Sequence, residues 1–152
     1  MLIILKNKDT LTFDDFEFKC CIGQKGLTYQ KKEGDKKTPR GTFSIGPLFY
    51  RKDRNIKPKT QLKIFQITKT MGWCDDSNHK KYNQLIKINK KIKAEKLYRN
   101  DYKYDYLIPI NYNTLKPKKN KGSAIFIHLT KNYQKKLGCI GLKKKDLLIL
   151  LK

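Results

Sequence analysis

The sequence predicts a mainly β domain of the α+β class, with two or three short helices. Short apolar runs rich in β-branched and aromatic residues recur along the chain, and Gly, Pro and polar turns separate them. The 152 residues fit one domain, and no internal repeat or long linker divides residues 1–152. We therefore expect a domain with its own core, which does not need disulfide bonds.

Most of the chain has the pattern of strands. We expect strands at residues 2–5, 10–18, 38–45, 48–54, 61–68, 101–110, 123–128 and around Cys139. We expect helices or helical turns at residues 79–88, 92–98, 133–136 and 146–151. Asp75 and Asp76 precede the first of these helices, where one of them is expected to act as a cap. Glu95 and Arg99 are four residues apart on the second.

The formal net charge is +23, from 36 Lys and Arg against 13 Asp and Glu. Such a surface favours anionic partners, namely nucleic acid, an anionic membrane or acidic envelope polymers. The alternative is a compositional origin, because Lys, Ile, Asn and Tyr are all abundant and the lysines are scattered. The sequence contains no RNA-binding or helix-turn-helix pattern, so we expect no specific nucleic-acid partner.

The cysteines and the apolar segments bear on four features: a metal site, a disulfide framework, a membrane span and a secretory signal. Adjacent Cys20 and Cys21 are expected to pack in the core. Cys74 and His79 have no second pair of ligands at zinc spacing, so we expect no metal. We also expect no disulfide framework, since a nucleophilic cysteine must stay free. No stretch reaches the ~20 apolar residues of a membrane span. Residues 2–5 lack the longer apolar region of a secretory signal.

The chemistry of the chain centres on His128 and Cys139. His128 ends an apolar, β-prone run, and Cys139 directly follows Gly138. A nucleophilic thiol needs a nearby base, and a short return from strand to strand brings the two together. Gly138 lets the backbone approach a substrate carbonyl, so the N–H groups of Gly138 and Cys139 are candidates for an oxyanion hole. The alternative is a buried Cys and a hydrogen-bonded His without catalytic function.

Three motifs resemble L,D-transpeptidases of the YkuD type. A His that precedes a Gly-Cys pair resembles the catalytic motif of that family. Residues 38–43 (TPRGTF) resemble its Thr-Pro-x-Gly-x-Phe strand entry. Residues 71–76 (MGWCDD), followed by Tyr82 and Asn83, resemble a segment of a small, single-domain branch. The three matches occur in the order typical of the family and span most of the chain.

The resemblance implies an L,D-transpeptidase-like β-sandwich or mixed sheet and a cysteine acyltransferase. The nucleophile would be Cys139, with His128 as its base, and no cofactor would be needed. A base beside the thiol also predicts a depressed pKa for Cys139. A third group should orient His128, either a backbone carbonyl or a side chain. The substrates would be peptidoglycan stem peptides, and the location would be the cell envelope or periplasm. Because no secretory signal is visible at residues 2–5, a cytoplasmic location is the alternative. The implied substrate-binding residues are Thr38, Pro39, Gly41, Trp73 and Ser123. For Trp73, the alternative to a wall of the substrate groove is a position in the core.

The chain also departs from the commoner family pattern. That pattern has Ser or Thr three residues before the Cys and often a His two residues before it, where this chain has Lys136 and Leu137. It often has Arg two residues after the Cys, where this chain has Gly141. Gly141 offers no charge for a substrate carboxylate. The small branch tolerates a small residue at this position.

Two other functions remain open at this point. The first is a different cysteine amidase or peptidase that uses the same pair of residues, and the reaction products would distinguish it from a transpeptidase. The second is a basic module that binds polyanions and whose Cys139 is not reactive. It predicts strongly salt-dependent binding and an inert thiol.

Overall fold

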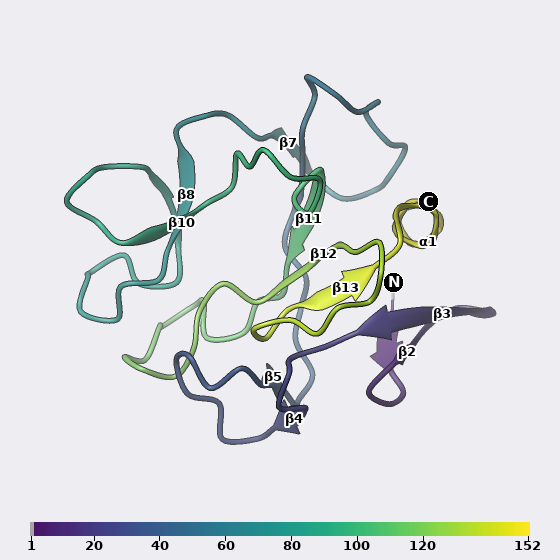
Figure 1. The fold of residues 1–152 in the computed structure, drawn as a ribbon, viewed down its shortest axis with the longest axis horizontal. Helices are drawn as coiled ribbons and strands as arrows, with labels where there is room; N and C mark the ends of the chain where they lie inside the picture. The colour runs from purple at the N-terminus through teal and green to yellow at the C-terminus, as the bar shows by residue number, and fades with distance from the viewer. Residues whose placement is uncertain (1) are drawn as a thin grey trace.

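The computed structural model describes residues 2–152 and is built around an eight-stranded sheet (Figure 1). In spatial order its strands are β1 (Ile3–Leu5), β2 (Thr10–Phe13), β3 (Phe16–Cys21), β13 (Ile140–Leu142), β12 (Phe126–Leu129), β11 (Tyr106–Pro109), β6 (Leu48–Tyr50) and β7 (Ile64–Gln66). The β12–β13 and β6–β7 pairs are parallel, and the other pairs are antiparallel. The predicted mainly β, α+β class is confirmed.

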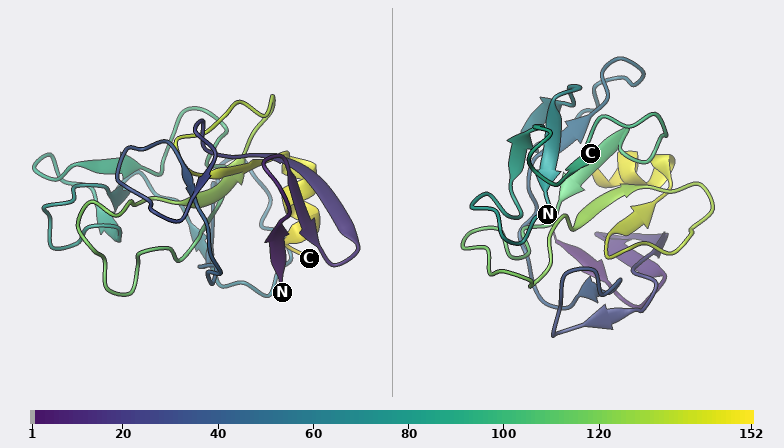
Figure 2. Two further views of the ribbon diagram at one scale, coloured as in Figure 1. Left: turned by 90° about the horizontal axis from the view of Figure 1, so that it is seen from below. Right: turned by 60° about the vertical axis from the view of Figure 1, so that its left-hand side comes forward.

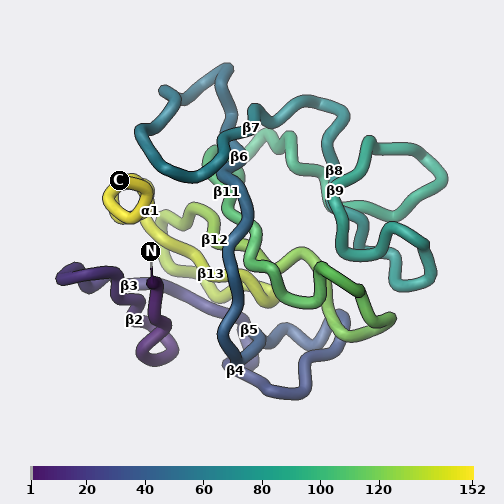
Figure 3. The backbone as a smooth tube through the Cα atoms, turned by 180° about the vertical axis from the view of Figure 1, so that it is seen from behind, coloured from purple at the N-terminus to yellow at the C-terminus, as the bar shows by residue number. Residues whose placement is uncertain are grey.

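Two smaller sheets and one helix complete the described chain. In the three-stranded sheet, β8 (Met71–Cys74) lies between β9 (Leu85–Lys87) and β10 (Ala94–Lys96). β4 (Leu27–Thr28) pairs in parallel with β5 (Thr38–Pro39). The helix α1 (Lys144–Leu150) directly follows β13. Figures 1, 2 and 3 show the three-stranded sheet and α1 on opposite sides of the large sheet's central strands.

The central strands β11, β12 and β13 are buried on both faces, which explains their continuous apolar character. Alternate side chains of a strand point to opposite faces. Ile127 and Ile140 therefore pack with α1 in one core cluster. Phe126 and Cys139 pack with Trp73 in a second cluster, toward the three-stranded sheet. The candidate nucleophile thus belongs to the face away from α1.

The helix predicted at residues 79–88 is wrong. Residues 77–84 form turns, and β9 follows with alternating burial. Asn83 has a φ of +57°, which ends any helical path at that residue. The Asp76 carboxylate accepts a hydrogen bond from the Asn78 N–H at 3.0 Å, so it closes a local turn instead of capping a helix.

The helix predicted at residues 92–98 is also wrong, because β10 pairs with β8 there. Glu95 accepts a hydrogen bond from the Tyr104 hydroxyl, a partner that no helical spacing predicts. Residues 133–136 form no helical turn, since Lys136 bridges to Gly23 beside β3. The C-terminal helix predicted at 146–151 is confirmed as α1, and its Leu147 and Leu150 are fully buried, as is Leu151 directly after it.

Several predicted strands are shorter than expected. Of residues 38–45, only β5 pairs as a strand, and of residues 101–110, only β11 does. The predicted run 10–18 is a hairpin of β2 and β3 that turns between Phe13 and Phe16. Cys20 and Cys21 lie in the core as predicted, and all four cysteines are free.

Candidate active site

Parallel pairing of β12 with β13 brings His128 and Cys139 onto one face of the sheet. The register places Ile127 opposite Ile140 and His128 opposite Gly141. Cys139 is therefore next to Phe126, whose N–H donates a hydrogen bond to the Cys139 Sγ at 3.4 Å. Because side chains alternate along a strand, Cys139 and His128 are diagonal neighbours on the same face.

The thiol of Cys139 is held by main-chain groups. Its S–H donates to the Ala124 carbonyl at 3.3 Å, and the side chain is only 9% exposed. Ala124 has a φ of +53°, an uncommon conformation for a residue other than Gly that costs roughly 1–2 kcal/mol. Ala124 thus combines an unfavourable backbone conformation with the carbonyl that holds the thiol, a combination typical of functional sites.

A backbone carbonyl orients the imidazole of His128. Its Nδ1 lies 3.0 Å from the Leu129 carbonyl oxygen. A carbonyl can only accept, so Nδ1 carries the proton and Nε2 is left with a free lone pair. The ring also makes an edge-on contact with Tyr104, with centroids 5.2 Å apart. The third group, which the sequence left open between a backbone carbonyl and a side chain, is therefore the Leu129 carbonyl.

Burial keeps both members of the pair uncharged. It lowers the pKa of His128 to about 3, and the positive charge of Lys136 acts in the same direction. Burial also raises the pKa of Cys139 to about 12, and the negative charge of Glu95 adds to this shift. The depressed thiol pKa predicted from a base beside Cys139 is thus wrong for the free protein. At neutral pH the site holds a thiol and a neutral imidazole.

Thr38 holds the backbone just before the cysteine. Its hydroxyl donates to the Gly138 carbonyl at 2.7 Å and accepts from the Gly23 N–H at 2.9 Å. Within residues 2–152, neither Gly138 nor Cys139 donates its own N–H to another protein group. Thr38 is therefore a positioning residue for the two N–H groups predicted to bind an oxyanion.

Trp73 and Ser123 each make a polar contact close to the cysteine, but with different partners. The Trp73 indole N–H donates to the Asn83 side-chain oxygen at 2.9 Å, and the same oxygen accepts from the Ala124 N–H at 3.0 Å. Ser123 donates to the Glu33 carboxylate at 2.8 Å. Trp73 is 8% exposed and packs edge-on against Phe126 at 5.2 Å. The structure thus places Trp73 in the core, the alternative to a wall of the substrate groove.

Asn83 is the main residue of the site that sequence reasoning left without a role. It is 2% exposed, and its amide nitrogen donates to the carbonyls of Tyr112 and Asn113 at 2.9 and 2.8 Å. Together with its bonds to Trp73 and Ala124, all four side-chain hydrogen-bond positions are used. In the sequence, the signal for a role of Asn83 was its position in the family-like segment at residues 71–83. Its function as a support for Ala124 depends on contacts distant in sequence.

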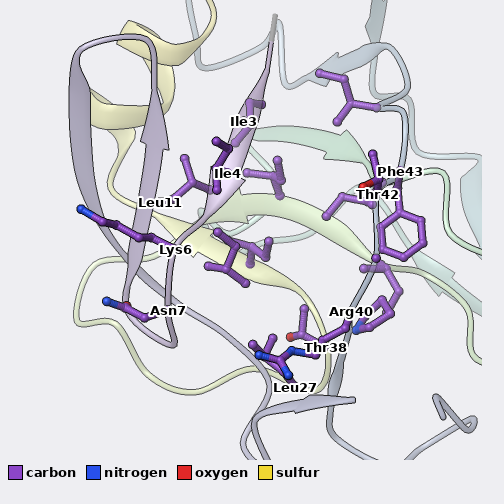
Figure 4. A pocket seen from close by; sticks show the side chains of 18 of the residues that line it. Ile3, Ile4, Lys6, Asn7, Leu11, Leu27, Thr38, Arg40, Thr42 and Phe43 are labelled. Atoms are coloured by element: carbon purple, nitrogen blue, oxygen red, sulfur yellow. The ribbon is translucent and has the colours of Figure 1, made fainter. Parts of the chain in front are cut away.

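A cavity of about 870 Å³ lies on the opposite face of the sheet (Figure 4). Ile3 and Leu11 lie on one side of it, and Thr42 and Phe43 on the other. The predicted substrate-binding residues that line it are Thr38, Pro39 and Gly41. Its lining also includes Ile127 and Ile140 of the cluster that packs with α1, so this cavity is separated from the Cys139 thiol by the sheet.

The family comparison covers the whole chain. The model of the YkuD family, the L,D-transpeptidase catalytic domain, matches residues 1–152. The chain belongs to this family. No curated protein and no solved structure matches it significantly. Membership in the YkuD family makes the Cys139–His128 face the candidate catalytic site of an L,D-transpeptidase-type enzyme.

Two further features of this YkuD domain concern metals and membranes. Among residues 2–152, no three His, Cys, Asp or Glu side chains are arranged to hold a metal ion. In the same residues, no helix is long and apolar enough to cross a bilayer.

We expect the buried, neutral His128 to make stability pH-dependent. Its pKa is about 3 in the folded chain and 6.5 for the ordinary side chain, so between these values the unfolded chain binds more protons. The contribution of His128 to the free energy of unfolding therefore falls as the pH drops below about 6.5, by up to ~1.4 kcal/mol per pH unit. Urea unfolding at pH 7 and pH 5 should show that His128→Gln flattens this slope. His79→Gln, at a partly exposed turn, is the control, and equal slopes for both variants would contradict the expectation.

We expect Asn83→Gly to destabilise the fold by about 3 kcal/mol, because it leaves several buried groups without partners. Glycine accepts the positive φ of this position, so the loss reports on the side chain and not on backbone strain. Chemical denaturation would measure the change, with Asn78→Ala as a control at an exposed position of the same segment. A loss under about 0.5 kcal/mol, typical of surface positions, would refute the supporting role of Asn83.

Proposed function

We propose that this chain transfers peptidyl groups between peptidoglycan stem peptides through a thioester on Cys139. The observation that carries the proposal is the shared face of Cys139 and His128, with the His128 ring oriented by the Leu129 carbonyl. Family membership supports the reaction class. The stem-peptide substrate follows from the family alone.

The first half of the reaction forms the thioester. The Cys139 sulfur attacks the carbonyl before the terminal D-Ala of a tetrapeptide, while its proton passes to Nε2 of His128. The N–H groups of Gly138 and Cys139 bind the developing oxyanion. The imidazolium then gives its proton to the departing D-Ala amine as the C–N bond breaks. Since both groups are neutral in the free protein, the proton leaves sulfur as the S–C bond forms.

The second half consumes the thioester. An amine of a neighbouring stem attacks the thioester carbonyl, and His128 takes one proton from that amine. The S–C bond breaks, and the proton returns to sulfur, which regenerates the thiol. Water as the acceptor gives an L,D-carboxypeptidase reaction instead. These substrates place the working location in the cell envelope.

The decisive experiment is intact-protein mass spectrometry after incubation with a carbapenem, whose strained amide mimics the acyl donor. We expect one covalent adduct on the wild-type chain and none on Cys139→Ala, because acylation requires the thiol. Cys20→Ala is the matched control, since Cys20 packs in the core cluster on the α1 side and should not affect the adduct. A folded, reduced wild-type chain without an adduct would argue against the proposal.

We expect His128→Gln to slow adduct formation by about 10²-fold or more, because a neutral thiol without a base is a weak nucleophile. Time-resolved mass spectrometry would give the rate, and far-UV circular dichroism would verify the fold. An unchanged rate would remove His128 from the mechanism. A cysteine amidase or peptidase would give the same adduct, so chromatography of products from stem tetrapeptides then tests for cross-linked dimers.

A further inference from the structure

The face that carries Cys139 and His128 also carries a lysine side chain that lies over a glycine. Gly141 lies between Cys21 of β3 and His128 of β12 in one row across the sheet. A Cβ built on Gly141 would lie 2.8 Å from Cε of Lys136 and 2.6 Å from Sγ of Cys21. The space that a side chain at position 141 would need is therefore filled by the stem of Lys136 and the thiol of Cys21.

Main-chain pairing fixes Lys136 in this place. Its N–H donates to the Ile22 carbonyl at 2.8 Å, and its carbonyl accepts from the Gln24 N–H at 2.8 Å. These two bonds extend the edge of β3 and turn the side chain back over Gly141. The Nζ then lies 3.4 Å from Oγ1 of Thr130, which is at the long limit of a hydrogen bond.

Among residues 2–152, the ammonium group of Lys136 has no anionic partner. None of the ion pairs formed within residues 2–152 involves it, although it is half-buried. Lys31, whose charge also acts on the Cys139 thiol, is instead paired with Asp35. Burial lowers the pKa of Lys136, and the positive charge of Lys103 adds to this effect, while the Cys139 and Cys21 sulfurs oppose it. A half-buried cation without a counter-ion gains most from an anion supplied by a ligand.

We infer that Lys136 is a specificity-determining residue whose ammonium group binds the free carboxylate of the acyl donor's leaving amino acid. This inference rests on the proposed acyl transfer at Cys139. The Cα of the leaving residue is about 3.8 Å from the Cα of the residue that carries the reacting carbonyl. The carboxylate of the leaving residue therefore lies beside the thiol and not at a remote surface. The ligand class is a peptide that ends in a free α-carboxylate directly after the scissile bond.

The first test uses small alkylating reagents and needs no substrate. Iodoacetate and iodoacetamide react with the same thiolate but differ in charge, so the ratio of their rates isolates attraction to a carboxylate from any change in thiol pKa. We expect Lys136→Met, which keeps an unbranched stem over Gly141, to lower the iodoacetate-to-iodoacetamide ratio at Cys139 by about tenfold. Peptide mapping would separate this residue from Cys21, and Lys135→Met is the exposed control with the same loss of charge.

The second test compares two acyl donors, a stem tetrapeptide with a free C-terminal carboxylate and the same peptide as its amide. We expect Lys136→Met to raise KM for the acid by about tenfold or more and to leave KM for the amide unchanged. Lys136→Arg should restore the preference for the acid. Unchanged ratios in both experiments for a folded Lys136→Met chain would overturn the inference. A shifted alkylation ratio without any peptide transfer by the wild type would support the carboxylate site and refute the proposed function.

Discussion

Parallel pairing between β12 and β13 is the contact on which the candidate site depends. Ten residues connect the two strands, and none of them forms a helix. The pairing puts His128 and Cys139 on one face, and it leaves the opposite side chains, Ile127 and Ile140, to anchor both strands against α1. A slip of one residue would exchange these faces and turn the thiol into the α1 core. The register of β12 and β13 therefore decides whether the imidazole and the thiol lie on one face.

The site combines deep burial with main-chain hydrogen bonding. The Leu129 carbonyl sets the imidazole tautomer, and the Ala124 carbonyl and Phe126 N–H hold the thiol. These partners are backbone groups without net charge. The Phe126 N–H favours the thiolate and the Leu129 carbonyl favours the imidazolium, but burial outweighs both. Burial consequently favours the neutral forms on both sides. The charge of the half-buried Lys136 ammonium acts on both members of the pair.

Polar residues outside the candidate pair, Cys139 and His128, shape the same face. Asn83 connects the turn after β8, the loop at 112–113 and the backbone of Ala124 through a single buried amide. Thr38 also supports the site, because its hydroxyl connects Gly23, just after β3, to the carbonyl of Gly138. Such fully satisfied buried groups fix geometry, because moving one partner leaves others without hydrogen bonds. They explain why motifs distant in the sequence are needed for one site.

The sequence by itself determined the mainly β class, the C-terminal helix, and the two side chains with the chemistry of a nucleophile and a base. The helices predicted from local spacing at residues 79–88 and 92–98 are wrong. Both segments contain a strand that pairs with β8, and helical periodicity does not encode this pairing. Only the tertiary structure decided the tautomer of His128, the raised pKa of Cys139 and the position of Lys136 over Gly141. The physical reason is that burial, and charges brought close by folding, act through space and not along the chain.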